Sequence, residues 1–192
     1  MRLRTQPGTT FVYSNLGPEV IGFGLEKVFT MPFEELVRQR ITGPLALRDT
    51  GFVVPAEARS RLMQAFGSDR RPMPYHPRNA GAAWGLYSTT ADLAKYVAWH
   101  LDENNPVVRR AHELVRGVAH EGEALIWNLA TEGGERMLWH GGGSFGMTSE
   151  ILRYPDQHEG YVLLANDACS GSEGALKAAA QSIHGARLPI IQ

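Results

Sequence analysis

The sequence predicts an α+β fold, with helices first and an antiparallel sheet closed by a final helix. Two observations lead to this prediction. Apolar residues recur at helical spacing in four segments of the first 120 residues. After Gly122, short β-forming runs alternate with Gly, Pro and Asp turns, and an alanine-rich helix follows them. We expect residues 1–120, the helical region, and 121–192, the sheet with its helix, to form one structural unit.

The first two helices are expected before residue 42. Asn15 is placed to N-cap a helix over 16–29, because apolar residues follow it at helical spacing. A second helix runs through 33–41 and ends at Gly43-Pro44. Residues 45–84 hold many prolines, glycines and arginines without a sustained period. We interpret them as a long irregular excursion that covers a functional groove.

The remaining elements follow from capping residues and β-forming runs. Ser88 or Thr89 can cap a helix over 90–101, and a further helix follows the break at Asn104-Asn105-Pro106. Small residues in the last helix suit close packing on a sheet. The expected elements after residue 105 are a helix over 107–116, strands over 124–130, 136–139, 147–154 and 160–165, and a helix over 172–184.

Composition excludes several classes of function. The chain has 192 residues, 43% hydrophobic and 20% charged, with net charge −1 and no basic cluster, which argues against nucleic-acid or polybasic membrane binding. One cysteine and seven scattered histidines predict no disulfide and no metal site. No apolar run approaches the roughly 20 residues of a membrane span, and the start lacks the apolar stretch of a signal peptide. Composition leaves the compartment open, with the cytoplasm as the default.

The stretch Trp139 to Gly146 is the first candidate site. Four glycines in six residues leave bare backbone N–H groups against which a ligand could lie. His140 stands beside them and can donate, accept or carry charge near neutral pH. The alternative is a glycine-rich hairpin with one surface histidine.

Tyr13-Ser14-Asn15, at the start of the first helix, is the second candidate. A tyrosine hydroxyl can relay a proton, and an asparagine amide can hold a substrate carbonyl. The alternative is that Tyr13 packs and Asn15 only caps the helix. Residues 142–146 also match Gly-x-Ser-x-Gly around Ser144. A nucleophile elbow needs a helix after the serine, whereas a strand is expected here, so we interpret this match as coincidental.

Four segments resemble the superfamily of serine β-lactamases and penicillin-binding proteins, most closely its branch of class C enzymes, D-aminopeptidases and family VIII esterases. The chain has Tyr13-Ser14-Asn15 where that branch has Tyr-x-Asn, and His140-Gly141-Gly142 where it has Lys-Thr-Gly or His-x-Gly. The other two segments are Pro44-Leu45-x-Leu47-x-Asp49-Thr50-x-Phe52 and Gly85-Leu86-Tyr87-Ser88-Thr89-x-x-Asp92-Leu93-Ala94. All four stand in the family's order.

The resemblance implies acyl transfer from an ester, lactam or amide, with no cofactor. It makes Tyr13 a general base and His140 the polar group of the third motif. Asn15, with Ser14 beside it, would contact the substrate, as would Gly141 and Gly142. It also places the backbone N–H of Gly143 in the oxyanion hole. Esters are expected over β-lactams, because His140 replaces the fixed cation of Lys-Thr-Gly.

The sequence departs from the family at its first motif. The family's nucleophile lies in Ser-x-x-Lys, and none of the serines in this chain has a lysine three residues later. We therefore expect a truncated form of the fold, in which Ser144 or Ser14 would be the substitute nucleophile. The uncovered sheet would favour a homo-oligomer or a complementing chain. The alternatives are a ligand-binding or scaffold remnant without turnover and a fragment active only with a partner.

Overall fold

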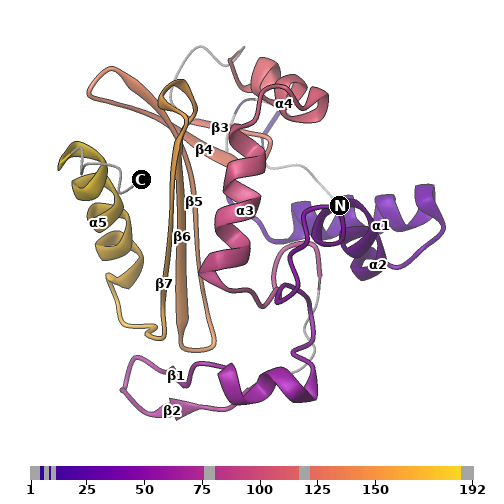
Figure 1. Cartoon of the computed structure of the whole chain (residues 1–192), viewed down its shortest axis with the longest axis vertical. Coiled ribbons are helices and arrows are strands. Elements are labelled where there is room, and N and C mark those ends of the chain that lie inside the picture. Colours follow the sequence, from indigo (N-terminus) through magenta and orange to yellow (C-terminus); the bar gives the residue numbers. More distant parts are fainter. Residues whose placement is uncertain (1–4, 7–8, 10–11, 76–80, 117–121, 187–192) are drawn as a thin grey trace.

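A five-stranded antiparallel sheet with helices on both sides forms the larger part of the molecule (Figure 1). The computed structural model describes residues 5–6, 9, 12–75, 81–116 and 122–186. The helices are α1 (Leu16–Phe29), α2 (Phe33–Val37), α3 (Thr90–Leu101), α4 (Pro106–Arg116) and α5 (Ser172–Ala186). The sheet contains β3 (Gly122–Ala124), β4 (Trp127–Glu132), β5 (Glu135–Ser144), β6 (Met147–Tyr154) and β7 (Glu159–Ala165), in that spatial order. The predicted α+β fold is confirmed.

The core lies between the sheet and α5. Met137, Leu152, Tyr154 and Ala180 form a cluster with at most 2% of each residue exposed. Alternation places Met137 on β5 and Leu152 and Tyr154 on β6 on one face of the sheet, and Ala180 lets α5 approach closely. The helix α3 packs against β7 from the other side (Figure 1).

Three expectations about the elements were wrong in detail. The expected strand over 124–130 is two strands, β3 and β4, because Leu125 and Ile126 both have positive φ and form a turn. A β-branched residue such as Ile126 rarely adopts positive φ, so composition alone favours a continuous strand. The strand expected at 136–139 extends to Ser144 as β5. The excursion over 45–84 contains a 3₁₀ helix at Ala56–Arg61 and a hairpin of β1 (Ala65–Phe66) and β2 (Pro72–Met73).

Among the described residues, exposed large apolar side chains gather most densely on α1, whereas we expected an uncovered apolar face on the sheet. The two faces of the sheet meet α5 and α3, so neither is bare. On α1, by contrast, Val20, Phe23 and Val28 are each more than 60% exposed. An apolar face of this kind favours association. Within the described residues, no helix is long and apolar enough to cross a membrane.

The motif segments Pro44–Phe52 and Gly85–Ala94 meet at one buried carboxylate. Asp92, in the first turn of α3, is 3% exposed and accepts hydrogen bonds from the Asp49 N–H at 2.7 Å and the Thr50 hydroxyl at 3.0 Å. The Thr89 side chain caps α3 by accepting from the Asp92 N–H, as predicted. These two segments therefore hold the excursion onto α3, and their role is structural.

His184 ties the end of α5 to two strands. Its Nε2 lies 2.7 Å from Glu135 and its Nδ1 lies 2.8 Å from Glu159. Burial lowers the pKa of His184, but hydrogen bonds to Glu135 and Glu159 outweigh burial and raise the pKa above its ordinary value. Protonation of His184 therefore stabilises the fold fully below about pH 6.5, and this stabilisation is lost as pH rises through the raised pKa.

Replacing His184 with glutamine is expected to destabilise the chain more in mild acid than in base. The difference in unfolding free energy from the unmodified chain should be largest near about pH 5.5 and small near about pH 9. Urea unfolding at both pH values measures it. His158, an exposed histidine on a turn, is the matched control as His158→Gln. An equal loss at both pH values would show that the two ion pairs contribute nothing.

Candidate active site

The glycine-rich half of β5 has one open edge. Strand β4 pairs with β5 only as far as Asn128 opposite Trp139, whereas β6 continues along β5 to Met147 opposite Ser144. In the described part of the chain, His140–Ser144 therefore pairs with β6 alone. Gly142, Gly143 and Ser144 are also solvent-exposed. An extended ligand could add to this edge as a further strand.

The β5–β6 turn determines which backbone groups point to the open edge. Phe145 and Gly146 have φ of 47° and 77°, so they form a two-residue turn of type I′. In such a turn the closing pair, Ser144 and Met147, hydrogen-bond to each other across β5 and β6. Because the pairs alternate, the backbone N–H and C=O groups of Gly143 and Gly141 point away from β6, toward the open edge. The Gly143 N–H is thus directed toward the open edge, where it is free of the β6 ladder.

The start of α1 is connected to this turn through the loop at 81–84. The Glu19 carboxylate accepts hydrogen bonds from the Ala82 and Ala83 N–H groups at 3.3 and 3.2 Å. Gly22 lies against the same loop, since an added Cβ would meet the Ala82 side chain at 2.6 Å. Trp84 then stacks on Phe145 with ring centroids 6.0 Å apart. A continuous set of contacts therefore joins the helix that carries the Tyr-Ser-Asn segment to the end of β5.

The residues of the Tyr-Ser-Asn segment are exposed. Tyr13 is 67% exposed just before α1. The Ser14 hydroxyl accepts from the Leu16 N–H at 3.2 Å. Asn15 occupies the predicted N-cap position, but its side chain makes no capping hydrogen bond, so the prediction that Asn15 caps the helix is wrong. The helix start is held by Ser14, and the Asn15 amide takes no part in it.

His140 and Ser144 stand at opposite ends of the open edge. The half-buried His140 ring meets the Trp127 ring edge to face at 6.3 Å. Ser144 ends β5 and is followed by a turn and β6, with no helix, which confirms that the Gly-x-Ser-x-Gly match is coincidental. Within the described part of the chain, no hydrogen bond or ring contact joins His140 to Tyr13 or Ser144, so their cooperation in one site stays a prediction.

The β1–β2 hairpin covers the tip of the β5–β6 turn (Figure 1). The Phe66 N–H donates to the Gly146 carbonyl, and the Ala168 N–H donates to the Phe66 carbonyl, each at 3.2 Å. A hollow of about 470 Å³ lies between the hairpin and the turn, lined by Pro72, Met73, Phe145 and others. The excursion therefore covers the tip of the glycine-rich strand, and the expectation that it covers a functional groove stays a prediction.

Replacing Gly146 with alanine is expected to cost about 2 kcal/mol or more of unfolding free energy. The left-handed φ of 77° costs a non-glycine residue about 1–2 kcal/mol. The new Cβ would also meet the Phe66 backbone nitrogen at 2.7 Å, and a backbone cannot rotate away. Urea unfolding measures the loss. In the control Gly142→Ala, the Cβ would lie 3.4 Å from the Ser149 hydroxyl, so an equal loss there would contradict the argument.

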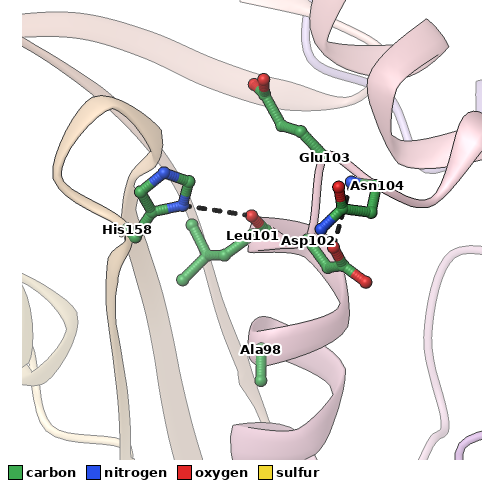
Figure 2. A pocket seen from close by; sticks show the side chains of 6 residues that line it. All are labelled: Ala98, Leu101, Asp102, Glu103, Asn104 and His158. Carbon is green, nitrogen blue, oxygen red and sulfur yellow. Dashed lines mark hydrogen bonds between the residues drawn. The ribbon is translucent and has the colours of Figure 1, made fainter.

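A second hollow, of about 510 Å³, lies at the other end of the sheet (Figure 2). It is lined by the end of α3 and the loop after it, and by His158 from the turn before β7. His158 Nδ1 lies 3.4 Å from the Leu101 carbonyl oxygen. None of the predicted site residues lines this hollow, and the described residues contain no group of three or more side chains suited to a metal ion.

Sequence reasoning missed the residues that connect the two halves of the site. Glu19 and Trp84 carry the contacts between α1 and the β5–β6 turn, but neither belongs to a motif. The one available signal was Trp84 at the end of a Gly-Ala-Ala run, where a large aromatic residue follows small ones.

Comparison with known proteins gives consistent results. A family model described as Beta-lactamase matches residues 1–185. The chain is 28% identical over 104 residues to the D-alanyl-D-alanine-carboxypeptidase/endopeptidase AmpH of Escherichia coli K12, an alignment covering 54% of this chain and 26% of that protein. It is 33% identical over 95 residues to a human protein named putative beta-lactamase-like 1, covering 48% of this chain and 19% of that one.

Solved structures share the fold. A beta-lactamase/D-alanine carboxypeptidase from Pseudomonas syringae superposes with a TM-score of 0.83 at 20% identity, covering 98% of this chain and 63% of that one. An octameric penicillin-binding protein homologue from Pyrococcus abyssi superposes with a TM-score of 0.77 at 22% identity, covering 94% of this chain and 44% of that one. The alignments with the curated relatives thus span about a quarter of their length or less, and this chain covers under two thirds of these two structures.

Proposed function

This chain belongs to the Beta-lactamase family, and from that premise we propose that it acts on small acyl esters at the open edge of β5. The observation that supports this proposal is the unpaired edge of His140–Ser144, with the Gly143 N–H directed outward. Backbone donors placed in advance are typically worth ~3–4 kcal/mol of the barrier to acyl transfer. Esters are favoured over β-lactams because His140 replaces a fixed cation.

The proposed roles follow the order of acyl transfer. A serine hydroxyl attacks the ester carbonyl, and Tyr13 accepts its proton. The carbonyl oxygen takes the electron pair and is stabilised by the Gly143 N–H. Collapse of this intermediate expels the alkoxide, which takes the proton from Tyr13 and leaves as the alcohol, and water then releases the acid from the acyl-serine. Ser144 is the serine nearest to Gly143 along the chain, and Ser14 adjoins Tyr13.

Turnover of p-nitrophenyl butyrate, with nitrocefin as the β-lactam comparison, tests the proposal. Tyr13→Phe and one of Ser144→Ala or Ser14→Ala should lower kcat/KM for the ester by about 100-fold or more. Ser60→Ala, at an exposed serine of the 3₁₀ helix, is the matched control and should keep full activity. Ester turnover that survives all three site changes would refute the assigned roles.

A second candidate function is ligand binding without turnover. Among the described residues, no histidine or lysine hydrogen-bonds to Ser14 or Ser144, so neither serine is paired with a histidine or lysine base there. Binding of a non-hydrolysable amide analogue, measured by calorimetry in the absence of any turnover, would favour this candidate. Loss of that binding on closing the edge with Gly143→Pro, which removes the outward N–H, would place the ligand on β5.

We also propose that the exposed apolar face of α1 is covered by association, either with a second copy or with a complementing chain. Light scattering of the purified chain decides between association and a monomer. A compact monomer whose stability does not depend on concentration would overturn this proposal.

A further inference from the structure

A fully buried carboxyl group lies behind the glycine-rich strand. Glu150 on β6 pairs in register with Gly141 on β5, and its side chain is on the face of the sheet that α5 covers. It is 0% exposed. Neither carboxyl oxygen of Glu150 has a hydrogen-bond partner among the described residues. A buried ionised carboxylate without donors is unfavourable by several kcal/mol, so an ionised Glu150 would strain the fold.

Gly141 brings a second carboxylate to the same place. A Cβ added to Gly141 would collide with both the Glu150 and the Glu173 carboxyl groups. Glu173 belongs to the first turn of α5 and is itself exposed to solvent. The two carboxyl groups thus converge over the bare Gly141 backbone, one from the sheet and one from the helix. Two ionised carboxylates that converge on one Cβ position repel each other, whereas one shared proton would convert the repulsion into a hydrogen bond.

The other charged groups around Glu150 come from α5 and from the segment before it. Lys177 Nζ lies 3.6 Å from the centre of the Trp139 ring and is the nearby cation. Asp167 is already bound by the Cys169 N–H and the Ser172 hydroxyl, each at 3.0 Å. Next to Glu150 on this face β5 and β7 bring Trp139, Gly143, Leu163 and Ala165, which carry no charge. Glu135 and Glu159 lie farther along the same face, where His184 at the end of α5 binds both of them. Burial raises the pKa of Glu150 to about 7, and the negative charge of Glu173 adds to this rise, whereas the positive charge of Lys177 opposes it.

We propose that Glu150 retains a proton and donates it in a hydrogen bond to the Glu173 carboxylate across Gly141, forming a pH-sensitive clasp that holds the first turn of α5 on the sheet. The clasp lies on the opposite face of β5 from His140, directly behind the third motif segment. The packing of α5 behind the glycine-rich strand would therefore depend on pH, whether or not the chain is an enzyme.

The direction of the pH dependence follows from linkage. A carboxyl group whose pKa is raised on folding binds its proton more tightly in the folded state. Its stabilising contribution is complete below its ordinary value of 4.5 and is lost as pH rises through about 7. The clasp should therefore open between about pH 5 and pH 8.

Two measurements on the full chain test the clasp. Carboxyl ¹³C NMR of glutamate-labelled protein should show one group titrating near pH 7, and this signal should disappear in Glu150→Gln. Hydrogen-exchange protection of the first turns of α5 should fall about ten-fold or more between pH 5 and pH 8 in the unmodified chain. In Glu150→Gln, whose amide donates at every pH, the fall should shrink to the part caused by His184 at the other end of α5, and adding His184→Gln should remove that remainder.

The controls separate the clasp from general effects of pH. Glu57→Gln, at an exposed glutamate of the 3₁₀ helix, should keep the full pH dependence. Glu173→Gln removes the repulsion and supplies a donor to an ionised Glu150, so the titration near pH 7 should move to lower pH. The proposal is overturned if every glutamate titrates below about pH 5, or if Glu150→Gln retains the pH dependence of the unmodified chain. Both readouts are independent of ester turnover.

Discussion

Replacing Tyr154 with alanine is expected to lower the free energy of unfolding by about 3–5 kcal/mol, the usual cost of removing a buried aromatic ring. Tyr154 is 0% exposed and belongs to the cluster between the sheet and α5. Its ring stacks on His184 with centroids 3.5 Å apart and meets Tyr161 edge to face at 6.1 Å. Alanine would leave a cavity where β6, β7 and α5 meet.

The matched variant Tyr154→Phe keeps the ring and removes only the hydroxyl group. Its expected cost is about 1 kcal/mol, the net value of one hydrogen bond. Urea unfolding of both variants, with the m-value checked for change, separates packing from hydrogen bonding. If the two variants lose the same stability, the packing of the ring is not what holds α5 to the sheet.

Replacing Asp92 with alanine is expected to cost about 3 kcal/mol, because three donors lose their acceptor. The bonds to the Asp49 N–H and the Thr50 hydroxyl are part-buried, and a buried donor that loses its acceptor costs about 1–3 kcal/mol, although Thr50 keeps the Ser88 hydroxyl at 2.8 Å. Lys95 Nζ, the third donor, lies 3.0 Å from Asp92 but is half exposed and can return to water. The loss of stability should therefore come mainly from the Asp49 N–H and the Thr50 hydroxyl.

Lys95→Met is the control, since it removes the ion pair but leaves both buried donors satisfied. It should cost about 1 kcal/mol or less. Burial raises the pKa of Asp92, yet the Lys95, Asp49 and Thr50 hydrogen bonds together hold the pKa below its ordinary value. The contribution of Asp92 is therefore present above about pH 4 and is lost as pH falls through its lowered pKa. A cost of Asp92→Ala no larger than that of Lys95→Met would contradict this account.

The two stretches that the resemblance singled out in the middle of the chain thus have a clear structural role. Asp49-Thr50 and Asp92 bond directly to each other, so they hold the excursion and α3 together. Tyr13, by contrast, is exposed, and the half-buried His140 ring packs against Trp127 without bonding to another motif segment in the described structure. A residue that the fold does not need in that place is a better candidate for binding or catalysis.

The sequence alone determined the elements whose signals are local. The helices at Leu16–Phe29 and Thr90–Leu101 have the predicted bounds, because apolar spacing and capping residues act within a few residues of each other. The strand Met147–Tyr154 was equally clear, since β-forming residues fill it and Pro155 ends it. The family and the α+β class followed from the order of these local signals.

Tertiary structure alone decided the features that depend on partners distant in the chain. The turn at Leu125–Ile126 exists because β3 and β4 pair with each other, against the local preference of isoleucine. The open edge of β5 arises because β4 stops pairing at Trp139, and the burial of Glu150 arises because α5 covers that face. Pairing register and burial are set by contacts between segments, and no local pattern of residues encodes where a neighbouring strand ends.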